Sequence, residues 1–164
     1  MFQIGDIVVY ENGGVCKVVK IGTPDFMKGD TQFYFLQPLF DNSGMIYLKV
    51  ENDTHILKPL PQPQEVDEIL GGAKDIAPMY NSSEKQRGVE FKEALRSCEI
   101  GQWIAMLKGI LMEKDRREKR GKRLNMSDDR NMQKVEQLLT TEISVVYQIP
   151  VEKAEERVQG VIAQ

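Results

Sequence analysis

The sequence has few of the residues that most enzymes use for catalysis or metal binding. Its 164 residues include one histidine and two cysteines. The histidine, His55, lies near the end of an expected strand, with no Ser-His-Asp or Cys-His pattern built on it. Cys16 and Cys98 fall in different expected domains and form no CxxC pair, so neither a zinc site nor a disulfide framework is indicated. We expect two reduced thiols that act as small apolar side chains.

Nucleotide-binding motifs are also missing. The sequence contains neither a P-loop nor a GxGxxG pattern, and its paired glycines, Gly13-Gly14 and Gly71-Gly72, are interpreted as turns. Carboxylates are plentiful, but no recognisable catalytic pattern frames them. We therefore expect a protein that is not an enzyme and that has no cofactor, no metal and no small-molecule substrate.

Long hydrophobic runs are the third class of feature that is lacking. No apolar run approaches the roughly 20 residues that a membrane-spanning helix needs. The start of the chain has neither the basic residues nor the apolar stretch of a signal peptide. We expect no membrane partner and a cytoplasmic location. The apolar content of 41% suits one or two small domains with hydrophobic cores.

The first part of the chain has the pattern of short strands joined by turns. Apolar, β-branched and aromatic residues form runs at 7–10, 15–21, 32–36 and 45–50. Asn12-Gly13-Gly14 is typical of a tight hairpin, and residues 41–44 are typical of a turn. Four or five strands in so short a span predict a strongly bent antiparallel sheet, because a flat sheet of this size would leave apolar surface wet. We expect a small Tudor-like or SH3-like β-barrel over residues 1–58.

Three closely spaced prolines, Pro59, Pro61 and Pro63, mark the end of this domain. Residues 59–83 are expected to form a linker with a short helix at 64–70, which stops at Gly71-Gly72. Residues 84–164 change to the helical period and are expected to form an all-helical domain. The predicted fold class is therefore α+β, with a small antiparallel β-barrel followed by an all-α domain.

The boundaries of the helices follow from capping residues and apolar stripes. Asn81 is the expected cap of a helix that runs to residue 97, with Glu84 three residues on. Apolar residues from Ile100 to Leu111 recur on one helical face, so Trp103 is expected in the core rather than in a ligand site. Two further helices are expected, one capped by Ser127 with an apolar face over 132–146, and one over 151–162 that starts at a proline.

Positive charge is concentrated in one segment of the chain. Residues 84–123 carry twelve basic and seven acidic side chains, whereas the formal net charge of the whole chain is -3. Lysine and arginine can neutralise phosphates and release counterions, which gives affinity without sequence readout. Interleaved acids leave open the alternative that these residues form salt bridges along exposed helices. The residues that we expect to contact DNA are Lys85, Arg87, Lys92, Arg96, Lys114, Arg116, Arg117 and Arg120.

The chain opens with the motif IGDIVVY at residues 4–10, ahead of the strand-rich and helical parts described above. In the order of these parts the chain resembles the CarD family of bacterial transcription regulators, and the best match is this motif, which is similar to the family's V-G-D-x-V-V-Y start. Residues 95–99, 111–115 and 124–132 are similar to motifs of the family's helical part. The resemblance covers roughly residues 1–148. It implies an N-terminal RNA-polymerase-interaction domain of Tudor-like fold and a C-terminal helical domain that contacts promoter DNA.

The resemblance also implies how the partners bind. Family members bind the β-subunit lobe of RNA polymerase by strand addition at a sheet edge that corresponds to residues 45–49. Met45, Tyr47 and Lys49 would then face polymerase, while the alternate residues at 46, 48 and 50 point inward. The bound protein would favour the open promoter bubble by shifting an equilibrium. The function implied is a regulator that binds the polymerase β subunit and contacts promoter DNA non-specifically to modulate open-complex stability.

Three positions depart from the family pattern. The family's wedge tryptophan, which enters the minor groove, would lie near Glu84, but residues 76–96 contain no tryptophan. Met79 and Tyr80 are candidate replacements for this wedge, and the alternative is that both pack under the loop that enters the helix. Tyr47 and Lys49 stand where arginine and proline are common. A function of another class also stays open: a β-barrel adaptor or scaffold that does not bind DNA and uses its helical domain for protein contacts.

Overall fold

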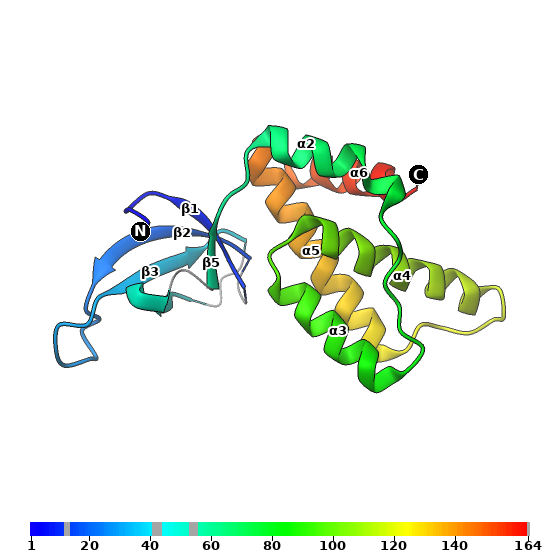
Figure 1. Cartoon of the computed structure of the whole chain (residues 1–164), viewed down its shortest axis with the longest axis horizontal. Coiled ribbons are helices and arrows are strands. Elements are labelled where there is room, and N and C mark those ends of the chain that lie inside the picture. Colours follow the sequence, from blue (N-terminus) through cyan, green and yellow to red (C-terminus); the bar gives the residue numbers. More distant parts are fainter. Residues whose placement is uncertain (12–13, 41–43, 53–55, 164) are drawn as a thin grey trace. The chain divides into compact units, whose positions relative to one another are not determined.

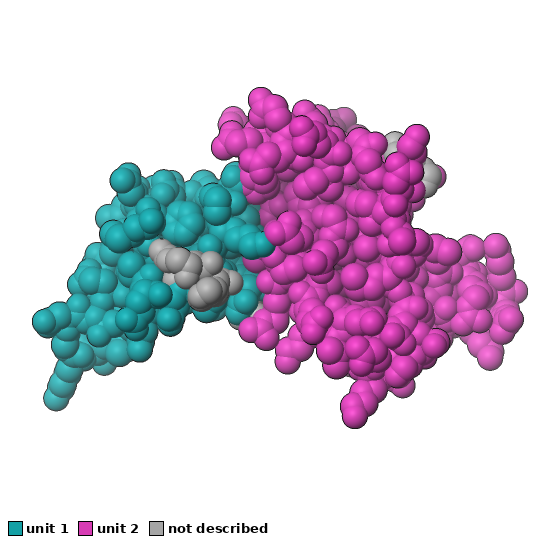
Figure 2. Space-filling view, in the orientation of Figure 1, with its two compact units in different colours: residues 1–60 teal, residues 61–164 magenta. Residues whose placement is uncertain are grey.

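The computed structural model describes residues 1–11, 14–40, 44–52 and 56–163 (Figure 1). The chain divides into two compact units, Met1–Leu60 and Pro61–Gln164, which Figure 2 colours separately. The first unit is a sheet of strands and the second is made of helices, so the α+β class is confirmed. Closure of the sheet into a Tudor-like or SH3-like barrel stays a prediction.

The first unit is a five-stranded sheet with every described pairing antiparallel and with the strand order β4-β3-β2-β1-β5. The register shifts between Val18 and Lys20 where β2 pairs with β3. Such a bulge bends a strand and increases its twist. The strands are β1 Ile7–Tyr10, β2 Gly14–Gly22, β3 Phe33–Pro38, β4 Ile46–Lys49 and β5 Leu57–Pro59.

The main core of the unit lies on one face of the sheet, while Val9, Val15 and Phe33 are buried on the other face. Tyr34 is completely buried in the main core, and its hydroxyl oxygen accepts a hydrogen bond from the Phe2 backbone N–H at 3.0 Å. This bond satisfies a polar atom that would otherwise be costly to bury. The core residues are Val8, Cys16, Val18, Tyr34, Leu36, Leu48 and Leu57.

Strand β5 was not predicted as a separate strand. It pairs with β1, with Val8 opposite Pro59, so the expected boundary at Pro59 lies inside the sheet unit rather than after it. Proline has no backbone N–H to donate. It is tolerated in an edge strand because the N–H groups on the outer side of that strand have no neighbouring strand to bond. Of the other sequence predictions, Asn12-Gly13, residues 41–43 and His55 lie outside the described residues.

The second unit begins with a short helix after the prolines and continues with four longer ones. Trp103, Phe91 and Ile143 are buried in its core, and the Trp103 indole N–H donates to the Ala94 carbonyl at 2.9 Å. The core role expected for Trp103 is thereby confirmed. Short 3-10 turns occur at Val50–Asn52 in the first unit and Ala73–Asp75 in the second. The helices are α2 Pro63–Gly71, α3 Glu84–Arg96, α4 Ile100–Glu118, α5 Met126–Tyr147 and α6 Val151–Ile162.

The helices confirm most sequence boundaries but correct two caps. Helix α3 is capped by Ser83, whose hydroxyl accepts from the Gln86 N–H at 3.3 Å, while Asn81 accepts from the Ser83 N–H. Helix α5 is capped by Asn125, which accepts from the Asp128 N–H at 2.8 Å, and not by Ser127. Both regions hold several residues able to cap, and the path of the entering chain decides which side chain reaches a free N–H.

No helix in the described part of the chain is long and apolar enough to cross a membrane. In the same residues, no group of three or more histidine, cysteine, aspartate or glutamate side chains is arranged to hold a metal ion.

Candidate protein-binding and DNA-binding surfaces

Strand β4 forms one edge of the sheet in the described structure. Leu48 is buried in the core, and Ile46 and Val50 pack against that core. Tyr47 is 42% exposed and Lys49 is exposed, while Met45 is half-buried. The two faces of the strand are therefore those expected from the alternation of residues.

Tyr47 belongs to a group of three aromatic rings, of which Phe26 and Tyr47 are exposed and Phe35 is half-buried. It lies opposite Phe35 on β3, with the two ring centroids 5.0 Å apart. Phe26, from the segment between β2 and β3, also contacts Tyr47, again with the two ring centroids 5.0 Å apart. The Lys20 ammonium lies 5.1 Å from the Phe35 ring centroid, within range of a cation–π contact. We call Phe26, Phe35 and Tyr47 the aromatic patch.

The aromatic patch has the properties of a protein-binding anchor. Phe26 is 69% exposed, and edge-to-face contacts hold Tyr47 in place before any partner arrives. Preordered aromatic side chains lose little entropy on binding and dominate many interfaces. The alternation of residues in the sequence points to Tyr47 but not to Phe26, because a phenylalanine in a loop shows no periodicity. Only the fold brings Phe26 beside β4.

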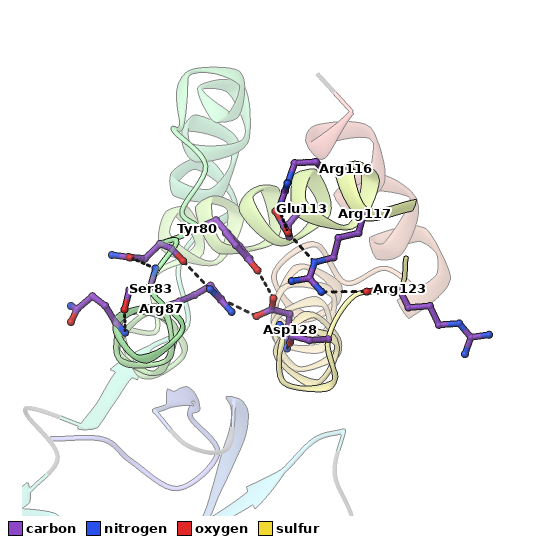
Figure 3. Close-up of polar contacts among 11 residues, drawn as sticks. Tyr80, Ser83, Arg87, Glu113, Arg116, Arg117, Arg123 and Asp128 are labelled. Atoms are coloured by element: carbon purple, nitrogen blue, oxygen red, sulfur yellow. Dashed lines mark hydrogen bonds and ion pairs between the residues drawn. The ribbon is translucent and has the colours of Figure 1, made fainter. Parts of the chain in front are cut away.

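In the helical unit, Arg87 is an internal residue rather than a surface one. It is 6% exposed, and its Nε–H donates to Asp128 Oδ1 at 3.1 Å (Figure 3). A second guanidinium nitrogen donates to the Asn81 carbonyl at 2.9 Å, and the group lies 4.5 Å from the centroid of the Tyr80 ring. The guanidinium is already enclosed and paired in the folded chain, so the expected DNA contact at Arg87 would require this pair to open.

The candidate wedge residues are also engaged inside the helical unit. The Tyr80 hydroxyl donates to Asp128 Oδ2 at 2.5 Å (Figure 3). The Tyr80 ring packs against Phe91. Burial, followed by the hydrogen bond to the Asp128 carboxylate, raises the pKa of Tyr80 to about 12. The Met79 backbone N–H donates to the Ala105 carbonyl. Tyr80 thus packs within the helical unit, as the alternative expected, and the use of Met79 or Tyr80 as a wedge stays a prediction.

Two of the remaining arginines share a buried carboxylate at the end of α4. Arg116 donates to both Glu113 oxygens, at 2.9 and 2.6 Å, and Arg117 donates to Glu113 Oε1 at 2.9 Å. These hydrogen bonds, chiefly the one from Arg116, lower the pKa of Glu113 to about 2 against the opposing effect of its burial. Part of the predicted basic cluster is thus neutralised internally, as the salt-bridge alternative expected.

The other expected DNA contacts remain at the surface. Lys85, Lys92 and Arg96 are exposed and lie at i, i+7 and i+11 on α3, which places them along one side of the helix. Arg116 remains 57% exposed despite its ion pair, Arg120 is exposed, and Lys114 is half-buried. We call Lys85, Lys92, Arg96, Lys114, Arg116, Arg117 and Arg120 the basic residues of the helical unit.

A comparison with known families finds a match for the first unit. Residues 2–60 match the family model described as the CarD-like/TRCF RID domain. This range corresponds to the unit Met1–Leu60, including strand β5 and the aromatic patch. No curated protein matches the chain.

Proposed function

Because the chain carries a CarD-like/TRCF RID domain, which marks a transcription-related protein that interacts with RNA polymerase, we propose that it is a transcription regulator. In this proposal the protein binds the polymerase β subunit through strand β4 and contacts promoter DNA non-specifically through its helical unit. It alters the stability of the open promoter complex by binding alone, with no chemical step and no cofactor.

The observation that carries the proposal is the exposed β4 edge with the aromatic patch beside it. An edge strand presents unpaired backbone groups that a partner strand can join. Tyr47 and Phe26 would add side-chain contacts next to those backbone hydrogen bonds. Backbone pairing would supply affinity, and the aromatic side chains would select the partner.

The direct test measures binding of the full chain to an immobilised β-subunit lobe by biolayer interferometry. We expect saturable binding that a large excess of duplex DNA does not abolish, because the polymerase surface lies in the first unit. A chain that stays folded and binds neither the lobe nor intact polymerase would refute the proposal.

The DNA part of the proposal predicts weak and strongly salt-dependent binding. Each phosphate contact contributes a slope of about 0.9 to the fall of log affinity with log salt concentration. Arg116 and Arg117 are already paired with Glu113. We therefore expect a smaller slope than the basic residues would give if each of them contacted a phosphate. Replacing both arginines by glutamate should reduce the slope further. An unchanged slope would show that Arg116 and Arg117 do not contact DNA and have only a structural role.

The effect on transcription can be measured as the lifetime of preformed open complexes after a competitor is added. We expect the lifetime to change with the full chain but not with the isolated first unit, because the change requires DNA contact. An equal effect of both would place the activity in polymerase binding alone.

Three observations favour the adaptor alternative. Arg87 is buried, Glu113 pairs with two further arginines, and Tyr80 is hydrogen-bonded to Asp128. A scaffold protein would bind polymerase through β4 and show no DNA affinity at low salt. Fluorescence anisotropy with labelled duplex DNA at about 50 mM salt separates the two functions, since phosphate contacts are strongest there.

A further inference from the structure

Helices α4, α5 and α6 border a groove of about 660 Å³ in the helical unit. Leu107 and Leu111 line it from α4, and Val158 and Ile162 line it from α6. None of the lining residues belongs to the β4 edge, the aromatic patch or the basic residues of the helical unit. The groove therefore requires an explanation separate from polymerase or DNA binding.

The groove is elongated along the helices. Its lining extends over the whole of α6, from Val151 to Ile162, which corresponds to about 16 Å at a rise of about 1.5 Å per residue. On α5 the lining runs from Gln133 to Thr141, or about 12 Å. A length of two to three helical turns matches an amphipathic helix laid into a groove, whose anchoring side chains recur at i, i+3, i+4 and i+7.

Two carboxylates lie on this apolar groove, Glu136 from α5 and Glu155 from α6. Within the described residues, neither forms an ion pair. Burial raises the pKa of Glu136, the charges of Asp129 and Glu155 also raise it, and the charge of Lys114 lowers it. A cation placed over the groove would relieve the repulsion between the two carboxylates.

We propose that this groove binds an amphipathic helix of a partner protein, with apolar side chains entering between α4 and α6 and with lysine or arginine contacting Glu136 and Glu155. Charge complementarity selects this occupant, because acids on the rim favour a basic partner and repel an acidic one. A second copy of the chain fits less well. A symmetric dimer would place Glu136 and Glu155 of one copy against the same acids of the other.

The test uses a fluorescently labelled 16-residue helical peptide with leucine at i, i+4, i+7 and i+11 and lysine on both flanks of that stripe. Its twin carries glutamate in place of each lysine. We expect the basic peptide to bind the full chain at least 10-fold more tightly than the acidic twin at low salt. Chemical-shift changes on binding should map to the groove-lining residues of α4, α5 and α6.

Variants of the chain separate the groove from general surface charge. Glu136→Gln with Glu155→Gln should weaken binding of the basic peptide at least 5-fold. Glu156→Gln is the matched control, since Glu156 is exposed on α6 and pairs with Lys153 at 3.6 Å instead of lining the groove. We expect this control to stay within 2-fold of the wild-type affinity. Circular dichroism verifies that each variant is folded.

Several outcomes would overturn the proposal. Equal affinity for the two peptides, or no binding of either, would remove the charge argument. Equal weakening by Glu156→Gln would assign the affinity to general surface charge. Unaltered binding after Leu111→Gln with Ile162→Gln would show that the apolar floor is not used. A concentration-dependent dimer that this double variant dissociates would identify a second copy as the occupant.

Discussion

At the scale of single residues, Arg87 shows why a basic side chain in a basic segment can be structural. Its guanidinium joins the segment before α3, through Asn81 and Tyr80, to Asp128 on α5. Burying the pair costs desolvation energy that the ion pair, two hydrogen bonds and the ring contact offset. Removal of one partner leaves the other charge buried without compensation.

We therefore expect Arg87→Met to lower the free energy of unfolding by about 3–5 kcal/mol in urea denaturation. Arg87→Met combined with Asp128→Leu should recover much of this loss, because no charge is then left buried. Lys92→Met is the control, as Lys92 is exposed on the same helix, and its effect should stay within about 0.5 kcal/mol. A loss below 1 kcal/mol for Arg87→Met would show that water reaches the site.

Glu113 makes stability depend on acid pH. Its pKa is lowered from 4.5 to about 2 in the folded chain, so the folded state binds this proton less readily than the unfolded state. The stabilisation is fully present above about pH 4.5 and is lost as the pH falls toward about 2. Glu113→Gln should flatten the stability profile in that window, while Asp115→Asn at the exposed Lys119 pair should not.

Tyr47 separates binding from folding in the first unit. Tyr47→Ala removes a 42% exposed ring and should weaken binding to the β-subunit lobe by about 10-fold or more, with the melting temperature nearly unchanged. Leu48→Ala removes a buried side chain from the same strand and should destabilise the unit by about 2–5 kcal/mol. If Tyr47→Ala unfolds the unit instead, Tyr47 belongs to the core.

At the scale of elements, the segment before α3 packs against α4 at a glycine. A Cβ at Gly109 would lie 2.0 Å from the Met79 carbonyl oxygen, closer than any real contact allows. The Met79 N–H also donates to the Ala105 carbonyl, one turn earlier on α4. This close approach holds the segment that delivers Tyr80 to Asp128.

Gly109→Ala should therefore destabilise the helical unit, because a backbone atom and not a flexible side chain stands in the way. The matched control is Gly88→Ala in α3, where a Cβ meets nothing within 4 Å. That substitution should stabilise the unit by up to about 1 kcal/mol through helix propensity. Thermal unfolding measures both, and equal stabilisation by the two alanines would show that the Met79 segment moves away freely.

At the scale of the whole molecule, the two units have separate cores, and strand β5 decides where the first one ends. The chain from Met1 to Leu60 includes the pairing of Val8 with Pro59 and the hydrogen bond from the Leu60 N–H to the Ile7 carbonyl. A fragment that stops at residue 58 lacks the end of β5, the edge strand that pairs with β1.

We expect residues 1–60 to fold alone and to bind the β-subunit lobe as tightly as the full chain. Residues 1–58 should unfold at a lower urea concentration, because they lack the last pairing of β5 with β1. Circular dichroism during a urea titration compares the two fragments. Identical midpoints would mean that the end of β5 contributes nothing to the stability of the sheet.

Local patterns were sufficient to predict most elements of this protein, but not strand β5. Alternating residues in β4 predicted which side chains are buried, and the apolar stripe of α5 predicted a helix whose residues Met132, Val135 and Ile143 are all buried. The strand-rich opening also carried the resemblance that the match at residues 2–60 confirms. These features recur with the period of a strand or of a helix, so a short stretch of sequence is enough to recognise them.

Only the tertiary structure decided what the functional side chains contact. The sequence by itself determined the α+β class, the helical face of Trp103 and the position of the basic segment. It did not determine that Arg87 meets Asp128, 41 residues away, or that Phe26 lies against Tyr47. Charge and ring type are local properties, but burial and pairing depend on segments that only folding brings together.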